Sequence, residues 1–285
     1  MSLSLQFLGT GTSVGVPQIG CSCQTCTSTD PRDRRRRTGA YVRTGKTAFL
    51  IDTPPEMRLA ALELGITKVD AVVVTHCHMD HVAGFDDLRR FNTINGTPGP
   101  DGRVIGAPMP CFAAQETLDS LHRIFPYISV KANEQGLFRP MIDFTPVDGP
   151  FAIGDVTLTP LPVEHGPRTN GYLMECGGER FAYISDCAAI PEETLRLMRD
   201  IDVLVLDCLR ARPHPTHLDL EQALGYVERI RPRRTWFVHM CHEVKHADFE
   251  ASLPPDVRLA YDGLTVEGDC SLDSEAVRKD NDKHA

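Results

Sequence analysis

The sequence lacks any apolar run that approaches the roughly 18 to 20 residues of a membrane span. Its opening, MSLSLQFLGTG, also lacks the basic segment followed by a long apolar segment that marks a secretory signal. Positive charge is scarce as well, since 30 Lys and Arg stand against 39 Asp and Glu, which leaves a net charge of −9. This deficit opposes unassisted binding to nucleic acids or to an anionic membrane surface. We therefore expect a soluble, cytoplasmic protein with neither a membrane nor a nucleic acid as partner.

The ten cysteines do not form the dense framework of a disulfide-rich protein, because they are scattered along a chain of 285 residues. Several stand inside apolar runs such as ERFAYISDC and DVLVLDCL, where we expect reduced core residues. Three others lie close together in GTGTSVGVPQIGCSCQTC, at Cys21, Cys23 and Cys26. This trio needs a separate explanation.

The chain is long enough to bury a substantial core, since 41% of its residues are hydrophobic. Short apolar runs rich in β-branched residues, such as KTAFLID and RTWFVH, predict buried strands, and LDLEQALGYVERI and PEETLRLMRDI predict helices. Strands outnumber helices. We predict one domain over residues 1–268, in which the Gly- and Pro-rich segment 92–150 is an insertion or lid, and a flexible polar tail at 269–285.

Residues that bind metals follow several of the predicted strands at the point where each strand stops. His165 follows VTLTPLPVE, Asp186 follows FAYIS, and His239 follows TWFV. In layered α/β proteins, groups at strand ends converge on one edge of a sheet, where ligands bind. The sequence therefore predicts a binding site assembled from distant segments.

The densest group of such residues is THCHMDH at 75–81, directly after the apolar run AVVV. In an extended loop, residues two apart point the same way, so His76 and His78 can bind one cation. Asp80 and His81 then turn toward a second cation. Three histidines and one aspartate within six positions predict a metal site rather than isolated polar residues.

This motif resembles the His-x-His-x-Asp-His signature of the metallo-β-lactamase superfamily, and the supporting residues follow in the family's order over residues 5–265. The resemblance implies an α/β protein with an αββα sandwich, in which two mixed β-sheets lie face to face with helices on the outside. It implies a dinuclear site at one edge, with the first metal bound by His76, His78 and His165 and the second by Asp80, His81 and His239. Asp186 would bridge the metals, and Asp52 would orient the metal loop from behind the ligands.

Two divalent ions about 3.5 to 4 Å apart can hold a bridging water, lower its pKa toward neutrality, and neutralise charge on the attacking and leaving oxygens. The resemblance therefore implies a metal-dependent hydrolase whose nucleophile is a hydroxide bound by the dinuclear centre. Imidazole suits zinc, manganese or iron, and carboxylates favour harder ions, so the ligand set leaves Mn²⁺, Zn²⁺ and Fe open.

The Cys-x-Cys-x-x-Cys trio supplies three thiolates that can face one tetrahedral ion, with a fourth position open. WFVHMCH places His242 three residues after His239, so one short segment can serve two sites. The GTGTSVGVPQIGCSCQTC start and the HMCH ending together are similar to the PhnP-like phosphodiesterase branch. That resemblance implies a structural Zn²⁺ bound by Cys21, Cys23, Cys26 and His242, with Cys241 as a competing ligand.

Two further histidines precede a predicted helix in RPHPTHLDLEQAL. In PhnP-like enzymes, a histidine at the position of His217 donates a proton to the leaving alkoxide, so we assign His217 as the general acid. His214 is the alternative, and Asp207 at the end of another strand would orient such a histidine. Asp80 is counted with His217 among the catalytic residues.

These features favour the hydrolysis of small or cyclic phosphodiesters, such as phosphoribosyl 1,2-cyclic phosphate. The run RDRRRR, with Arg32 and Arg34 to Arg37, argues against a small substrate, because its guanidinium groups can clamp a phosphate. The alternative is a solvated loop, which is the more common role of a run of like charge. A ribonuclease Z-like nuclease is an alternative, although the sequence has no long Gly-rich basic arm. A non-catalytic PqqB-like metal-binding protein and a thioester or lactam hydrolase are further alternatives, and a homodimer stays open.

Overall fold

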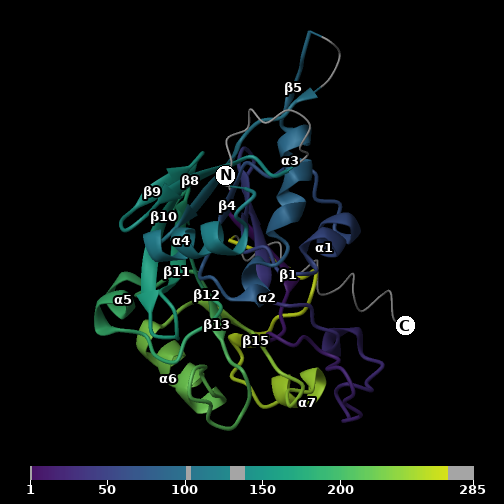
Figure 1. Cartoon of the computed structure of the whole chain (residues 1–285). Coiled ribbons are helices and arrows are strands. Elements are labelled where there is room, and N and C mark those ends of the chain that lie inside the picture. Colours follow the sequence, from purple (N-terminus) through teal and green to yellow (C-terminus); the bar gives the residue numbers. More distant parts are fainter. Residues whose placement is uncertain (1, 101–103, 129–138, 269–285) are drawn as a thin grey trace.

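The computed structural model describes residues 2–100, 104–128 and 139–268, which form two seven-stranded mixed sheets and a small hairpin (Figure 1). The first sheet has the order β16-β1-β2-β3-β4-β7-β8 and the second β15-β14-β13-β12-β11-β10-β9. The predicted tail at 269–285 lies outside the described residues.

The strands of the first sheet are β1 (Ser4–Gly9), β2 (Gly39–Arg43), β3 (Ala48–Ile51), β4 (Ala71–Val73), β7 (Met109–Ala113), β8 (Ile142–Pro146) and β16 (Thr265–Glu267). Those of the second are β9 (Phe151–Ile153), β10 (Val156–Val163), β11 (Thr169–Cys176), β12 (Glu179–Ile184), β13 (Val203–Asp207), β14 (Arg234–Val238) and β15 (Val257–Leu259).

Each sheet is antiparallel on one side and parallel on the other. Strands β3, β4, β7 and β8 are parallel neighbours in the first sheet, as are β12, β13, β14 and β15 in the second. Parallel neighbours end at the same edge, so the residues that follow β3, β4, β12, β13 and β14 are brought together without any sequence proximity.

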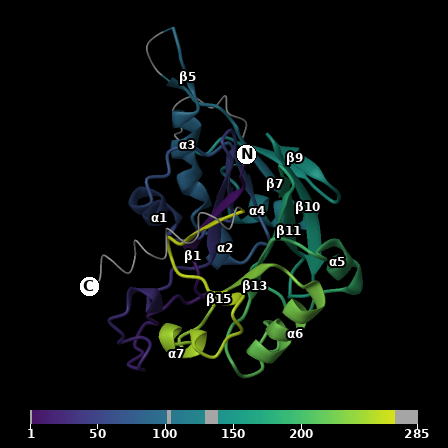
Figure 2. The ribbon, with the colours of Figure 1, turned by 180° about the vertical axis from the view of Figure 1, so that it is seen from behind.

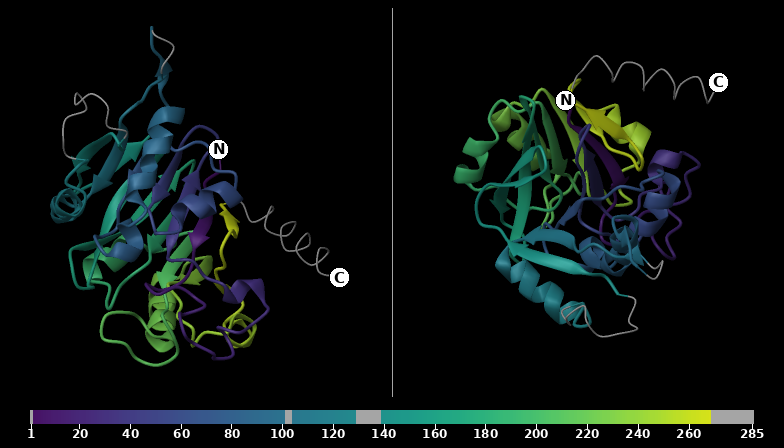
Figure 3. Two further views of the ribbon diagram at one scale, coloured as in Figure 1. Left: turned by 45° about the vertical axis from the view of Figure 1, so that its right-hand side comes forward. Right: turned by 90° about the horizontal axis from the view of Figure 1, so that it is seen from above.

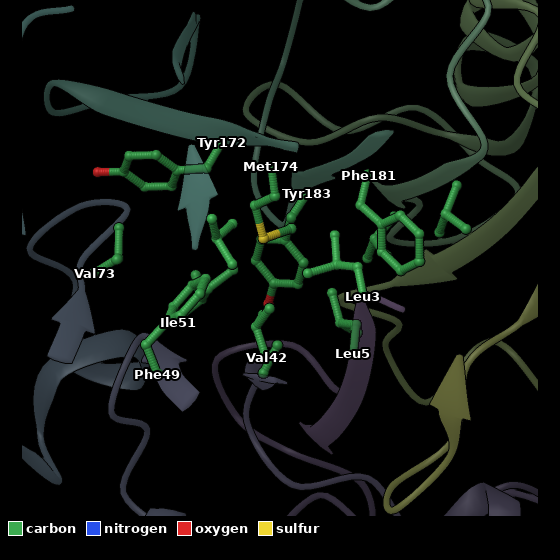
Figure 4. Close-up of a cluster of buried hydrophobic side chains, with 14 of the residues drawn as sticks. Leu3, Leu5, Val42, Phe49, Ile51, Val73, Tyr172, Met174, Phe181 and Tyr183 are labelled. Atoms are coloured by element: carbon green, nitrogen blue, oxygen red, sulfur yellow. The ribbon is translucent and has the colours of Figure 1, made fainter. Parts of the chain in front are cut away.

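The core lies between the two sheets, and both sheets contribute large apolar side chains to it. Tyr172, Met174 and Phe181 of the second sheet face residues of the first sheet that include Phe49 and Ile51 (Figure 4). These side chains are almost completely removed from water. Burial of apolar area on this scale holds the sheets face to face and makes the shared edge a rigid support.

Helices cover the outer face of each sheet, so the predicted αββα sandwich is confirmed (Figure 3). Figures 1 and 2 place α1 and α3 on one side of the sheets and α5 and α6 on the other. None of the helices in the described ranges is long and apolar enough to cross a membrane. The helices on the first sheet are α1 (Met57–Glu63), α2 (Met79–Val82), α3 (Arg89–Ile94) and α4 (Gln115–Ile124), and those on the second are α5 (Glu192–Leu197), α6 (Leu220–Ile230) and α7 (His246–Glu250). The short 3₁₀ turns are η1 (Pro31–Asp33) and η2 (Phe85–Leu88).

Segment 92–150, which we predicted to be an insertion or lid, differs in part from that expectation. Its strands β7 and β8 are paired members of the first sheet, and α4 packs on the same layer. Strand β7 shows the alternating burial of a half-buried strand, but Pro110 at its second position hides that pattern in the sequence. The hairpin of β5 (Thr97–Pro98) and β6 (Val104–Ile105) projects from the body of the molecule (Figure 1).

Candidate metal centres and active site

The residues of the predicted metal site follow strands from both sheets. Asp52, predicted to support the metal loop, comes directly after β3, Asp186 is the second residue after β12, and His239 comes directly after β14. Asp80 and His81 lie in α2, which follows β4. Asp52 and His239 have left-handed backbones, with φ angles of 63° and 61°. Residues other than glycine rarely adopt this backbone conformation. It often occurs at functional positions, where contacts with the surrounding structure stabilise the strained backbone.

The first group contains three histidines whose ring nitrogens converge. Nε2 of His76 lies 2.9 Å from Nδ1 of His78, and Nε2 of His165 lies 3.3 Å from the same atom. Nδ1 of His165 is 2.9 Å from the carbonyl oxygen of Thr216, which can accept its proton. That contact leaves Nε2 of His165 free to bind a metal.

The second group contains Asp80, His81, Asp186 and His239, all of which are buried. Nε2 of His81 lies 3.1 Å from Oδ1 of Asp186, and Nε2 of His239 lies 3.2 Å from Oδ2 of the same carboxylate. Oδ2 of Asp80 is 3.4 and 3.5 Å from these two ring nitrogens. Oδ2 of Asp186 is also 3.8 Å from Nε2 of His165, so Asp186 stands between the two groups, as a bridging ligand requires.

The donor set fits metal ions. Three of its buried atoms, Nε2 of His81, Oδ1 of Asp186 and Nε2 of His239, have no hydrogen-bond partner among the described residues, although they face one another. Such atoms are costly to bury unless a ligand satisfies them. These nitrogen and oxygen atoms converge on one point without bonding to each other, as the ligands of a metal ion do. Carboxylate and imidazole donors suit Zn²⁺, Mn²⁺ or Fe.

Burial and the neighbouring charges shift the pKa values of His81 and Asp80 in the second group in opposite directions. Burial alone would lower the pKa of His81, but the carboxylates of Asp186 and Asp52 raise it well above the ordinary value. Burial alone would raise the pKa of Asp80, but the imidazoles of His239 and His81 beside it lower that pKa well below that of an ordinary aspartate. Asp80 is therefore available as an anion, which is the form that binds a cation.

Asp52 supports the metal loop from behind. Its Oδ2 lies 2.7 Å from Nδ1 of His81 and accepts the hydroxyl proton of Thr75, while Oδ1 accepts the backbone N–H of Thr75. The carboxylate fixes the His81 ring so that Nε2 points at the second group. Asp52 thus occupies the supporting position that the resemblance implies.

His217 lies beside both metal groups and contacts Asp207. Nδ1 of His217 is 2.9 Å from Oδ2 of Asp207, and its ring stacks on His239 with centroids 4.6 Å apart. Asp207 is fully buried and also accepts the backbone N–H of Cys187. His214, the alternative general acid, is 5.3 Å from His217 between ring centroids, and its Nδ1 is in contact with Thr216 instead.

The segment before α6 is held at both ends, which fixes His217. Asp219 caps α6 by accepting the backbone N–H of Gln222, and the Gln222 side chain accepts the backbone N–H of Asp219. At the other end, the Thr216 carbonyl contacts His165. Ring nitrogens of His217 also come close enough to His165 and Asp186, or to Asp207 and His239, for His217 to serve as a metal ligand.

Cys21, Cys23, Cys26 and His242 form a separate cluster, in which all four ligand atoms lie within 4.8 Å of one another. Nδ1 of His242 is 3.2 Å from Sγ of Cys21 and 3.5 Å from Sγ of Cys23. These separations suit donors around one tetrahedral Zn²⁺, for which Zn–S distances are about 2.3 Å. Cys241, the competing ligand considered above, is not a member of this cluster.

The thiols of the cluster differ in their readiness to ionise. The backbone N–H of Cys26 bonds to Sγ of Cys23 and lowers the pKa of Cys23 to about 6, whereas burial raises the pKa of Cys26 to about 11. One thiolate is therefore already formed near neutral pH. All nine cysteines in the described ranges are free thiols, in agreement with the predicted reduced state.

The arginine run does not form an open phosphate clamp. Most of its side chains face carboxylates of the chain itself, and within the run Arg34 is the one exposed arginine for which no such pair is seen. The pairs are Arg32 with Asp30, Arg35 with Asp33, Arg36 with Glu63 and Arg37 with Glu56.

Two supporting residues were not predicted from the sequence. Thr75 anchors Asp52, and its position directly before His76 was an available signal. Thr216 acts through its backbone carbonyl, so its side chain carries no signal in the sequence.

Comparisons with known proteins agree with this geometry. The β-lactamase superfamily domain matches residues 47–240. A crystal structure of a diphosphatase from the PhnP family superposes with a TM-score of 0.82 at 36% sequence identity, covering 94% of this chain and 97% of that one. Zn²⁺-bound PqqB from Methylobacterium extorquens superposes with a TM-score of 0.72 at 21% identity, covering 92% and 99% of the two chains, and shares the fold.

A sequence relative adds a different name. A protein called octanoyltransferase from Porphyromonas gingivalis is 34% identical over 97% of this chain, but the chain spans only 53% of that protein's length. The domain match covers more than half of the chain, and the candidate metal ligands within it follow strands from both sheets of an αββα sandwich. The chain therefore belongs to the metallo-β-lactamase superfamily, and within it the chain is similar to the PhnP family.

Proposed function

We propose that this protein hydrolyses small or cyclic phosphodiesters, such as phosphoribosyl 1,2-cyclic phosphate, with His217 as the general acid. The observation that carries the proposal is the His217–Asp207 pair beside the metal groups. Nδ1 of His217 contacts Asp207, so the opposite ring nitrogen, Nε2, is free to donate a proton. The His217 ring is 4.6 Å from that of His239 and 4.9 Å from that of His165, within reach of a substrate held between the two groups.

The residues of the chain have distinct tasks in this reaction. His76, His78 and His165 would hold one cation, Asp80, His81 and His239 the other, and Asp186 would touch both. When bound, two divalent cations lower the pKa of water and offset the negative charge of a phosphate. Burial lowers the pKa of His217, which makes its protonated form a stronger acid toward a departing oxygen.

A phosphodiester matches this arrangement better than a carboxylic derivative does. An alkoxide is a poor leaving group near neutral pH, and a positioned imidazole that gives it a proton speeds its departure. Thiolates and anilides leave with less help. A histidine fixed by a buried carboxylate is therefore most useful where the P–O bond of an alkyl ester is broken.

The charge distribution supports a small substrate rather than an RNA. The net charge is −9, and four arginines of the 32–37 run are engaged with carboxylates. A polyanion gains its affinity from many free cationic groups, which these arginines do not supply. We accordingly propose neither a nucleic acid nor a membrane as partner.

Two other substrate classes each have one observation in their favour. The related PhnP-family structure is described as a diphosphatase, which favours a P–O–P linkage. The octanoyltransferase relative favours an acyl thioester or amide. A panel of metal-loaded assays separates them: an alkyl phosphodiester, bis(p-nitrophenyl) phosphate, a nucleoside diphosphate and an octanoyl thioester. We expect the phosphodiesters to show the highest kcat/KM.

The His217→Ala variant tests the mechanism. We expect kcat for an alkyl diester to fall by roughly 10² to 10⁴, because the alkoxide then leaves without a proton. The p-nitrophenyl ester should lose far less, since its leaving group is already stable as an anion, and His214→Ala serves as the control. Equal losses on both esters, together with loss of metal, would show that His217 is a ligand instead of the general acid.

A further inference from the structure

Arg35 is a fully buried arginine in a protein of net negative charge. Its side chain has 0% exposure, and Nη2 lies 3.3 Å from Oδ1 of Asp33, which is equally buried. Burial lowers the pKa of Arg35, but a guanidinium keeps its charge in proteins. A buried charge is costly unless its hydrogen-bonding groups are used, so the contacts of Arg35 indicate what it is for.

The other contact of Arg35 falls on the loop that carries two predicted metal ligands. Nη1 of Arg35 donates to the backbone carbonyl oxygen of Cys241 at 3.5 Å. Cys241 lies between His239, which belongs to the active-site group, and His242, which belongs to the thiolate cluster. Arg35 thus holds the middle of a four-residue segment whose two ends face different clusters.

The N-terminal segment GTGT fixes the same loop from a neighbouring position. The backbone N–H of Met240 donates to the carbonyl of Thr10, and that of Thr12 donates to the carbonyl of Met240. Gly11 lies between these contacts and Arg35, and a Cβ at Gly11 would come within 2.8 Å of the Cβ of Arg35. Any larger residue at position 11 would clash with Arg35, so glycine is needed there for Arg35 to reach the 239–242 segment.

Asp33 extends the arrangement past the loop. Its Oδ1 accepts the backbone N–H of His246 at 2.7 Å, at the first residue of α7. The Arg35–Asp33 pair therefore contacts the chain on both sides of His242, at the carbonyl of Cys241 and at the start of α7. The strained backbone of His239, with φ of 61°, needs such outside support to persist.

We infer that Arg35 is a positioning residue that couples the two clusters, because it holds the segment joining His239 to His242 in one conformation. Loss of order in the thiolate cluster is then transmitted to His239, and the reverse also holds, since coupling between two binding sites is reciprocal. The inference rests on the metal-binding role proposed above and is independent of the substrate.

A cobalt titration of the full-length protein tests the inference without an activity assay. Thiolate-to-Co²⁺ charge-transfer absorption reports on the thiolate cluster, and the visible ligand-field bands report on the imidazole and carboxylate groups. We expect Arg35→Met to weaken Co²⁺ binding at both clusters by roughly 10- to 100-fold, the range found for residues that orient metal ligands. Arg35→Lys should recover part of the loss, because an ammonium group can still pair with Asp33. The exposed neighbour Arg34 provides the matched control, Arg34→Met, which should change neither affinity.

A double-mutant cycle separates coupling from simple destabilisation. In the wild-type background, Cys23→Ser should weaken Co²⁺ binding at the active-site group by roughly tenfold, and in the Arg35→Met background it should have no further effect. Additive losses, or an Arg35→Met protein with both affinities unchanged, would overturn the inference. If Arg35→Met does not fold, the same cycle with Arg35→Lys decides, with a smaller coupling expected. A wild-type protein that binds no Co²⁺ at either cluster would overturn the metal-binding role itself.

Discussion

The thiolate cluster and the active-site groups lie at opposite ends of residues 239–242, yet the chain builds them in opposite ways. Three ligands of the thiolate cluster come from six consecutive positions of one loop, and two of them are partly exposed. The active-site ligands come from the ends of strands in both sheets, and most are buried. A loop site needs its metal to hold its shape, whereas the packed sheet edge places its ligands before any metal binds.

The two regions also differ in charge before metal binding. The active-site groups contain Asp80, whose pKa is well below the ordinary value, so this carboxylate is already an anion. In the thiolate cluster, burial keeps the pKa of Cys26 at about 11, so this thiol must lose its proton when Zn²⁺ binds. His81, whose pKa is raised well above the ordinary value by Asp186 and Asp52, must likewise lose a proton when a metal binds, so metal affinity should fall as the pH is lowered at both sites.

The largest effect should come from Asp186→Asn, which removes the carboxylate shared by both active-site groups. We expect turnover to be lost and the metal content to fall from about three ions per chain to about one, because only the thiolate cluster keeps its ligands. Elemental analysis and a phosphodiesterase assay measure both results. The exposed Asp148 gives the control Asp148→Asn. Retention of all metals would contradict the bridging position of Asp186.

Cys23→Ser should remove the metal of the thiolate cluster and lower stability more than turnover. We expect the loss of one zinc and a fall of about 3 to 5 kcal/mol in the free energy of unfolding, since loss of a bound metal is among the most destabilising single changes. Calorimetry and zinc analysis check this result, with Ser22→Ala as the control in the same loop. Unaltered zinc content would show that the trio is not a metal site.

Asp52→Asn should have a smaller effect that is confined to the active site. The amide cannot replace both acceptor contacts of the carboxylate, with His81 and with Thr75, so the orientation of His81 is less well fixed. We expect metal affinity at the active-site groups to fall roughly 10- to 100-fold, and affinity at the thiolate cluster to fall much less. Competition with a chelator measures each affinity. Equal losses at both clusters would remove the distinction drawn here.

The smallest effect should come from Asp30→Asn at the end of the thiolate loop. The hydrogen bond with Arg32 lowers the pKa of Asp30 from 3.8 to about 2, so its stabilising contribution is present above about pH 4 and is lost as the pH falls toward 2. The pair is partly exposed, so we expect no more than about 1 kcal/mol at neutral pH. Urea unfolding of wild type and variant should differ at about pH 6, differ less at about pH 3, and converge below about pH 2.

The sequence by itself determined the parts whose chemistry is local. THCHMDH and the cysteine trio each place several donors within a few residues, and spacing of this kind survives whatever the rest of the chain does. The order of strand-end residues His165, Asp186 and His239 was readable because apolar runs stop where ligands begin. These features carry the resemblance to the metallo-β-lactamase superfamily, and that resemblance implied the αββα sandwich and a metal site at one edge of the sheets.

Only the tertiary structure decided which side chains meet. Segment 92–150 gave no readable strand around Pro110, yet cross-strand pairing makes β7 and β8 part of the first sheet. The arginine run offers a phosphate clamp in the sequence, but in the folded chain carboxylates from other segments pair with Arg36 and Arg37. The fold also buries Arg35, whose guanidinium donates to the backbone carbonyl of Cys241. Contacts between residues two hundred positions apart depend on how the sheets pack, and packing leaves no local pattern in a sequence.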